Sequence, residues 1–243
     1  MNPYLEYQES DFKTLETETR IKEITKSIRI NFIRKVYGIL SFQILITTIF
    51  VILTMTIKSI KTFMINNPIL FYIILLLTII LPIIIICFPN TMNKVPLNYI
   101  ILLLFTLSES YLISFICSIS NGKIVLMACL MTFFMVVFLS LYAFFTDNDI
   151  TLKSSFLFIF AFSLFLFGFF LIFTNNKIIH IIYCVLGIIL FSFYLVYDTQ
   201  LIIGNKSYCV ETDDYILASF MLYTDIISIF LELLNLLQLL NGE

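Results

Sequence analysis

Long apolar runs separated by short polar breaks dominate the chain from about residue 36 to its end. A helix needs roughly 20 apolar residues to cross about 30 Å of hydrocarbon, and seven runs are long enough. They lie near residues 36–57, 69–88, 97–119, 124–146, 154–174, 178–203 and 215–240. Lipid permits only helices or closed barrels as spanning structures, and the alternating pattern of barrel strands is missing from the sequence. The pattern therefore predicts seven membrane-spanning helices.

The breaks between the runs contain turn-forming residues, such as Asn66-Asn67-Pro68, Asn121-Gly122 and Gly204-Asn205. Because these connections are short, consecutive helices should pack as antiparallel neighbours. We expect an all-α membrane protein whose residues 36–243 form a seven-helix bundle with a polar, central last helix. Residues 1–35 mix both charges without an apolar stripe, and we expect a cytosolic polar tail there.

Of the seven runs, the last is the least favourable to insert into the bilayer. Sixteen strongly apolar residues between Ile216 and Leu240 favour insertion by about 0.5 kcal/mol each. Asp225 and Glu232 oppose insertion by about 2.5 to 3.5 kcal/mol each. Such a helix should be stable only if its polar groups face the bundle, share protons or bind a cation. A re-entrant segment is the alternative.

Composition supports a protein that lies in the bilayer. Apolar residues make up 60% of the chain and charged residues only 12%, which leaves too little polar surface for a water-soluble globule. A net charge of −2 offers no basic face for nucleic acid. The five cysteines form no Cys-x-x-Cys pair, so we expect neither a disulfide framework nor a metal cluster, and no cofactor.

The basic residues predict the orientation of the chain. With the N-terminus in the cytosol, the cytosolic segments hold ten Lys and Arg residues, seven of them in the first 35 residues. The opposite segments hold four, namely Lys58, Lys61, Lys123 and Lys177. The positive-inside rule therefore favours a cytosolic N-terminus. No small-residue cleavage pattern follows the first run, which predicts a retained helix and not a signal peptide.

Acidic residues inside the apolar runs are the main candidates for function, because burying them in lipid is costly. Four residues qualify: Glu109, Asp198, Asp225 and Glu232. Asp198 precedes the last connection by about six residues and Asp225 follows it by about ten, so antiparallel neighbours bring them to similar depth. Two adjacent carboxyl groups in a low dielectric share a proton and titrate as a unit.

Once deprotonated, this pair would offer hard oxygen ligands to Ca²⁺, which takes six to eight oxygens. Water, Ser228, Thr199 or backbone carbonyls would have to complete the shell, so the site should be weak and leaky. Ser228 and Glu232 follow Asp225 at helical spacing and share its face. Polar packing between helices is the competing interpretation for Ser228, and the preferred one for the stripe of Thr106, Ser110, Ser114 and Cys117 beside Glu109.

Several sequence blocks resemble the Bax-inhibitor/lifeguard membrane family. They are FIRKVYGILSFQILIT (Phe32–Thr47), KVPLNYIILLLFTLSES (Lys94–Ser110), YAFFTDNDIT (Tyr142–Thr151), VYDTQLIIG (Val196–Gly204) and DDYILASFMLYTDIISIFL (Asp213–Leu231). The blocks follow the family's order and cover most of the chain after residue 30. Glu109 within FTLSES, together with SIKTFMINNP, resembles the Golgi anti-apoptotic branch.

This resemblance implies a pH-sensitive calcium leak channel in Golgi or endoplasmic reticulum membranes that lowers store calcium and inhibits apoptosis. It also implies partners among apoptosis-related membrane proteins, besides the bilayer and calcium itself. The family's paired aspartates map onto Asp198 and Asp225, which would be both pH sensor and calcium ligands. Its basic latch maps onto Lys94, in a segment poorer in Arg than is usual for the family.

Other functions compete with a leak channel. An intramembrane aspartyl protease also uses two aspartates on adjacent helices, but no Gly-x-Gly precedes Asp225 and no Pro-Ala-Leu motif follows it. A metal-dependent hydrolase needs more ligands than the single histidine His180 supplies. We therefore expect no enzyme. A non-conducting scaffold for apoptosis or stress proteins, and a proton-coupled calcium exchanger, stay open as alternatives.

Overall fold

The computed structural model describes the backbone of residues 3–88 and 94–242, and the side chains of these residues from residue 23 onward. This part of the chain contains helices and no strands. The helices are α1 (Pro3–Thr56), α2 (Lys58–Asn66), α3 (Pro68–Cys87), α5 (Leu97–Ile119), α6 (Gly122–Phe145), α7 (Ser154–Leu171), α8 (Lys177–Ile203) and α9 (Tyr215–Asn241), and a 3₁₀ turn η1 (Thr151–Lys153) precedes α7.

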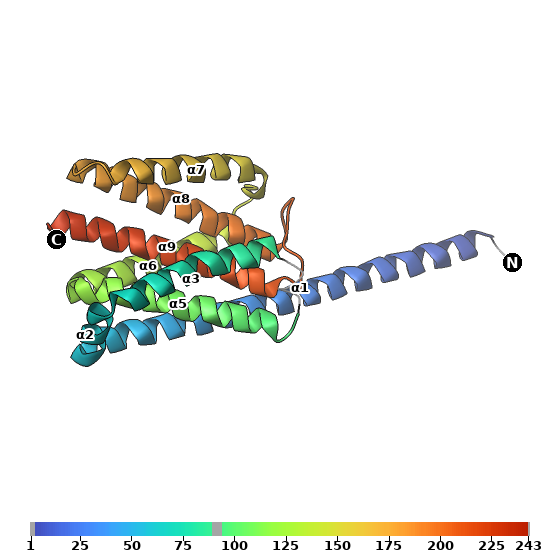
Figure 1. The fold of residues 1–243 in the computed structure, drawn as a ribbon. Coiled ribbons are helices and arrows are strands. Elements are labelled where there is room, and N and C mark those ends of the chain that lie inside the picture. Colours follow the sequence, from blue (N-terminus) through green and yellow to red (C-terminus); the bar gives the residue numbers. More distant parts are fainter. Residues whose placement is uncertain (1–2, 89–93, 243) are drawn as a thin grey trace.

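Seven helices in the described residues are long and apolar enough to cross a membrane. They lie side by side with alternating direction, and α1 extends beyond the bundle toward the N-terminus (Figure 1). The prediction of an all-α membrane protein with seven spans is confirmed. The expected boundaries lie close to the observed ones, and the third span, residues 97–119, coincides with α5.

The first span and the polar segment before it form one continuous helix, α1. The buried face of α1 begins at Phe32 and continues through Val36, Leu40, Gln43 and Thr47. Steps of three and four residues keep these side chains on one side of the helix. The part of α1 that packs into the bundle therefore starts a few residues before the expected span.

Helix α2 was not predicted from the sequence, which indicated only a connection between the first two spans. It buries Met64 at the corner between α1 and α3. The Asn67 side chain donates to the Phe63 carbonyl at 2.7 Å, and Pro68 occupies the first position of α3. Proline fits there because the first backbone amides of a helix have no intrahelical acceptor.

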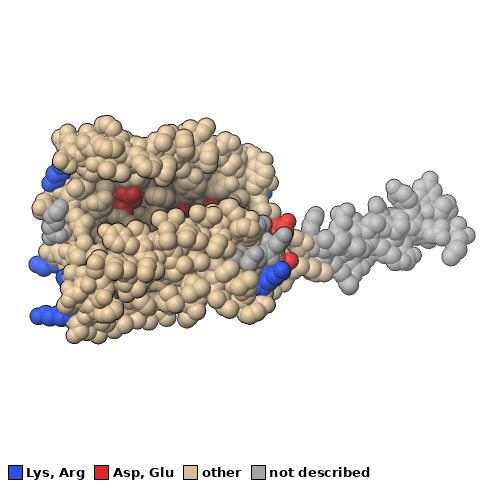
Figure 2. Space-filling model, viewed as in Figure 1, with Lys and Arg blue, Asp and Glu red and all other residues tan. Residues whose placement is uncertain are grey.

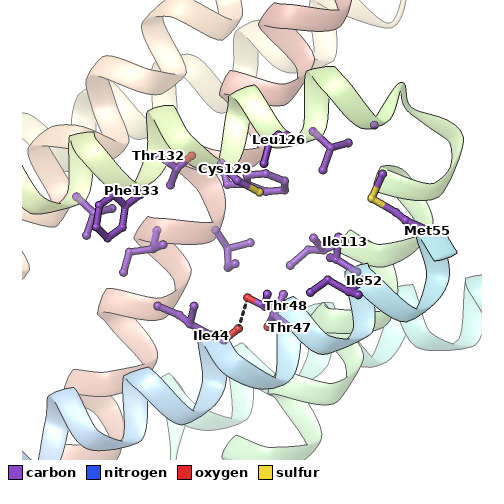
Figure 3. A pocket seen from close by; sticks show the side chains of 17 residues that line it. Ile44, Thr47, Thr48, Ile52, Met55, Ile113, Leu126, Cys129, Thr132 and Phe133 are labelled. Carbon is purple, nitrogen blue, oxygen red and sulfur yellow. Dashed lines mark hydrogen bonds between the residues drawn. The ribbon is translucent and has the colours of Figure 1, made fainter.

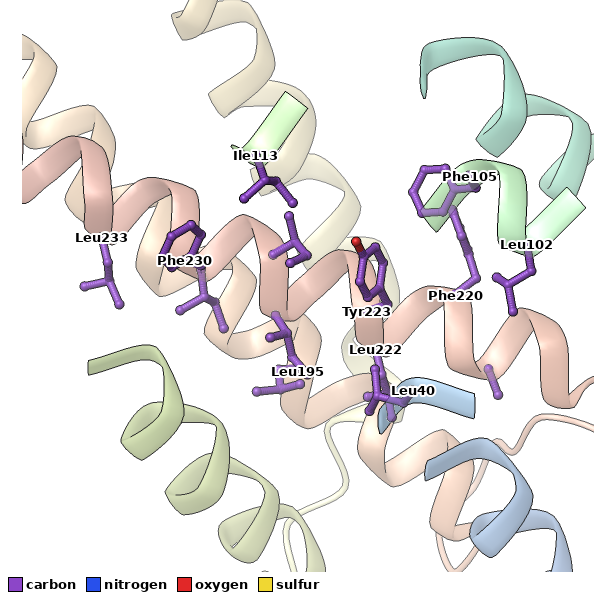
Figure 4. Packing of buried hydrophobic residues seen from close by; sticks show 14 of the residues in the cluster. Leu40, Leu102, Phe105, Ile113, Leu195, Phe220, Leu222, Tyr223, Phe230 and Leu233 are labelled. Carbon is purple, nitrogen blue, oxygen red and sulfur yellow. The ribbon is translucent and has the colours of Figure 1, made fainter. Parts of the chain in front are cut away.

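Helix α9 is the centre of the bundle and packs against α8, α1, α6 and α5. Within its most apolar stretch 61% of the residues are buried, against 22% or less for α1, α3, α6, α7 and α8. Its core side chains meet those of α1, α5 and α8 (Figure 4). Because α9 is an uninterrupted helix, the structure favours a full span over a re-entrant segment. Of its two acidic residues, Asp225 is buried and Glu232 packs against α8.

Candidate functional site

Asp198 of α8 and Asp225 of α9 meet inside the bundle. Both are buried, with 4% and 6% of their surface exposed, and their carboxyl groups lie close enough to form a hydrogen bond when one of them is protonated. Such a bond needs one proton, which the protonated carboxyl donates to the other. The antiparallel packing of α8 against α9 thus brings together the two aspartates that the sequence singled out.

The surroundings of the pair contribute few hydrogen-bond donors. No hydroxyl, amide or amine of the described residues donates to Asp225 Oδ2, so a shared proton, water or a cation has to satisfy this oxygen. The Thr199 hydroxyl, one residue after Asp198, is also buried and lies beside the Tyr37 hydroxyl of α1 without good hydrogen-bond geometry. The site is therefore rich in oxygen and poor in positive charge.

Gln200 fixes the end of α8 that carries Asp198. Its side-chain oxygen accepts from the Ile150 amide at 2.9 Å, and its side-chain nitrogen donates to the Asn148 carbonyl at 2.9 Å. Lys206 strengthens the same junction by donating to the Thr146 carbonyl at 2.9 Å. The loop after α6 is thereby held against α8 and the loop that follows it.

Arg29 of α1 binds the C-terminal end of α8. Its guanidinium donates to the carbonyls of Leu201, Ile203 and Val210. These contacts leave no room for a side chain at Gly204, whose φ of 72° ends the helix. A cation at the negative end of α8 is also favourable for the helix dipole. Sequence reasoning missed Arg29, because the contact joins residues more than 170 positions apart.

Lys94, the residue expected to act as a latch, is exposed in the turn before α5. In the described part of the chain it forms no ion pair with Asp198 or Asp225. The basic side chain that the structure places against α8 near the aspartates is therefore Arg29, and not Lys94.

A buried chain of hydroxyl groups joins α1, α5 and α9 on the other side of Asp225. Thr47 contacts the Ser110 hydroxyl at 2.9 Å and the Tyr223 hydroxyl at 2.8 Å, while Gln43 donates to Thr106 at 3.0 Å. Thr106 and Ser110 belong to the stripe for which the sequence favoured packing. In the structure they connect α5 to α1 through these hydrogen bonds.

The remaining candidate residues lie on α5 and α9. Glu109 of α5 and Ser228 and Glu232 of α9 are partly buried. The Glu232 carboxylate packs against Gly187 and interacts with the Cys184 thiol, both on α8. Figure 2 shows acidic side chains in a hollow midway along the molecule, whereas the other charged side chains in this view lie at its two ends. Carboxylates thus occur at more than one depth along α9.

The described residues contain no group of three or more His, Cys, Asp or Glu side chains that could hold a metal ion. The aspartate pair supplies two carboxylates, so a calcium ion bound there would need most of its oxygens from water and neutral groups. This ligand set suits transient binding and does not suit a permanently held metal.

Seven apolar helices around a buried carboxylate pair define a polytopic membrane protein with a titratable centre. The chain belongs to the family described as inhibitor of apoptosis-promoting Bax1, whose model matches residues 29–242.

Relatives from plants, animals and a virus match the chain over most of its length. It is 35% identical to protein LIFEGUARD 2 of Arabidopsis thaliana over 222 residues, which is 88% of this chain and 90% of the relative. It is 30% identical to protein lifeguard 3 of Homo sapiens over 216 residues, which is 87% of this chain and 70% of the relative. It is also 32% identical to the Golgi anti-apoptotic protein of Vaccinia virus (strain Lister) over 218 residues, which is 89% of this chain and 88% of the relative. The resemblance found in the sequence blocks is confirmed.

Proposed function

We propose that this protein is a pH-sensitive calcium leak channel of Golgi or endoplasmic reticulum membranes that lowers store calcium and thereby restrains apoptosis. The closely placed pair of Asp198 and Asp225, buried between two spans, is the observation that carries the proposal. The names of the relatives, which include a Golgi anti-apoptotic protein, support the apoptotic part.

The mechanism follows from the charge of the pair. With one or two protons bound, the aspartates hydrogen-bond to each other and hold α8 against α9. Loss of the shared proton leaves two negative charges in a low dielectric, which repel each other unless a cation lies between them. Calcium binding and separation of the two helices therefore both become more favourable as the pH rises.

The decisive experiment is calcium efflux from proteoliposomes of the purified protein between pH 6 and 8. Asp198→Asn and Asp225→Asn should each abolish most of the pH dependence, because an amide does not exchange the proton. Each should also weaken calcium binding by removing one anionic ligand. Asp147→Asn, in the exposed loop after α6, is the matched control and should keep both properties.

The same measurement separates the other candidate functions. Absence of protein-dependent efflux at every pH would contradict the channel and favour a non-conducting scaffold. Flux that reverses with an imposed pH gradient would indicate a proton-coupled exchanger. Wild-type pH response and affinity in both aspartate variants would refute the role of the pair.

A further inference from the structure

A groove of 560 Å³ lies between α1 and α6 with α9 as its floor, and neither aspartate of the pair is among its lining residues (Figure 3). Along α6 it reaches from Gly122 to Val136, about 21 Å at 1.5 Å per residue. One leaflet of a bilayer contributes about 15 Å of hydrocarbon. The groove is thus longer than the hydrocarbon of one leaflet and long enough to hold a single acyl chain that runs parallel to the helices.

The wall of the groove presents almost only hydrocarbon. Its three threonines direct their hydroxyls to protein acceptors and not into the space. Thr48 donates to the Ile44 carbonyl at 2.8 Å, and Thr132 donates to the Ala128 carbonyl at 2.8 Å. The Thr47 hydroxyl is engaged by the Gln43 carbonyl, Ser110 and Tyr223. A polar ligand would find no free hydroxyl hydrogen to accept here, whereas an apolar chain needs none.

One end of the groove is basic. Met55 and Gly122 close this end, since a side chain at Gly122 would contact the Met55 methyl group at 3.4 Å. Lys58 and Lys123 follow these two residues on α2 and α6 and are exposed. Neither lysine forms an ion pair with a carboxylate in the described part of the chain. Two uncommitted positive charges therefore lie where the head group of a lipid in the groove would reach the membrane surface.

We propose that this groove is a binding site for an anionic glycerophospholipid, with one acyl chain between α1 and α6 and the head group at Lys58 and Lys123. The apolar wall selects hydrocarbon. The two lysines, which lie on the side opposite the cytosol in the orientation that the basic residues favour, attract a negatively charged head group. The bilayer supplies the ligand. The floor of the groove includes Ile226, next to Asp225, so a lipid in the groove contacts the turn of α9 that carries Asp225.

The chain contains no tryptophan, which permits a direct test by fluorescence quenching. Phe133 lines the groove and is 61% exposed, whereas its neighbour Phe134 is 55% exposed and does not line it. Single-tryptophan variants Phe133→Trp and Phe134→Trp are placed in phosphatidylcholine vesicles with increasing fractions of phosphatidylserine brominated on its acyl chains. Circular dichroism and monodisperse elution verify that both variants fold.

The Phe133→Trp variant should reach half-maximal quenching at about 25-fold lower phosphatidylserine content than Phe134→Trp, since each of the two lysines confers about a fivefold preference for an anionic lipid. With brominated phosphatidylcholine the two variants should give similar curves. Adding Lys58→Gln and Lys123→Gln to Phe133→Trp should abolish the preference for phosphatidylserine.

Coinciding curves for the two tryptophans in phosphatidylserine would overturn the proposal, because the groove would then be filled like any lipid-facing surface. No quenching of Phe133→Trp by either lipid would also overturn it and would indicate a protein segment in the groove, such as a second copy of the chain. A preference that survives loss of both lysines would refute the head-group assignment.

Discussion

Gly187 shows how closely α8 and α9 approach beside an acidic side chain. A Cβ atom at this position would lie 2.9 Å from the Glu232 carboxyl carbon. At Gly38 in α1 a Cβ atom would meet nothing within 4 Å. The two glycines, both inside helices, thus differ in whether a methyl group fits.

We expect Gly187→Ala to lower the free energy of unfolding by about 1 kcal/mol, the low end for overpacking, because the end of the flexible Glu232 side chain can move away from the added methyl group. Gly38→Ala should instead raise it by about 0.5–1 kcal/mol, because alanine is the better helix former. Thermal unfolding in detergent measures both. Adding Glu232→Ala should restore the stability lost in Gly187→Ala. A double variant as unstable as the sum of the single ones would show that Glu232 is not the obstacle.

Asp149, outside the spans, binds the loop after α6 to the loop after α8. Its carboxylate accepts from the Thr151 amide at 3.0 Å and the Ser207 amide at 3.0 Å. These hydrogen bonds hold the pKa of Asp149 well below its usual value. A depressed folded pKa stabilises the fold above the unfolded pKa of about 3.9, and this contribution disappears as the pH falls toward the folded pKa.

The difference in stability between the wild type and Asp149→Asn should therefore be constant from pH 5 upward and shrink below about pH 4. Denaturation midpoints measured across this range test the expectation. Asp213→Asn, an exposed carboxylate in the loop before α9, provides the control. A difference that stays constant down to pH 2 would contradict the assigned hydrogen bonds.

At the scale of elements, Arg29 connects α1 to the end of α8 that carries Asp198. Arg29→Ala leaves three carbonyls without their donor, and hydrogen bonds from a charged group are worth about 1.5–3 kcal/mol each. We expect faster hydrogen exchange in residues 201–210. The free energy of unfolding should fall by at least the value of one such hydrogen bond, about 1.5–3 kcal/mol. Arg29→Lys should rescue little, because an ammonium group does not reproduce the fork of donors.

Arg34→Ala removes an exposed arginine one turn further along α1 and serves as the matched control. Exchange in residues 201–210 should stay at the wild-type rate in this variant. Equal effects of the two alanine substitutions would mean that general charge, and not the specific contact, stabilises the end of α8.

The sequence predicted the elements well because hydropathy and length determine which segments span a bilayer. It also placed Asp198 and Asp225 at matching depth, since that depends only on the distance of each residue from the connecting loop. It could not predict the contacts of Arg29 or Gln200, because these depend on how distant segments pack. The short helix α2 was missed for a similar reason, as nine residues carry too little periodicity to distinguish a helix from a connection.

At the scale of the whole molecule, an odd number of spans places the two ends of the chain on opposite sides of the membrane. The bundle end where α1 enters also carries the loops after α6 and α8, which are joined by Lys206 and Asp149. Helix α9 ends at the other side of the bundle, together with α2 (Figure 1). The sequon Asn205-Lys206-Ser207 therefore lies on the same side as the N-terminal segment, and a sequon placed beyond the C-terminus lies on the opposite side.

With the cytosolic N-terminus that the basic residues favour, Asn205 should never be glycosylated, whereas a C-terminal extension carrying a sequon and a flexible spacer should be. Gel mobility before and after endoglycosidase treatment of microsomes distinguishes the two sites. Substitution Ser207→Ala removes the natural sequon and identifies any modification at Asn205. A glycan on Asn205 would reverse the orientation, and would move the basic end of the groove to the cytosolic leaflet. Failure of the C-terminal sequon to be modified, in membranes where a control protein is glycosylated, would contradict the seven-span topology with a cytosolic N-terminus.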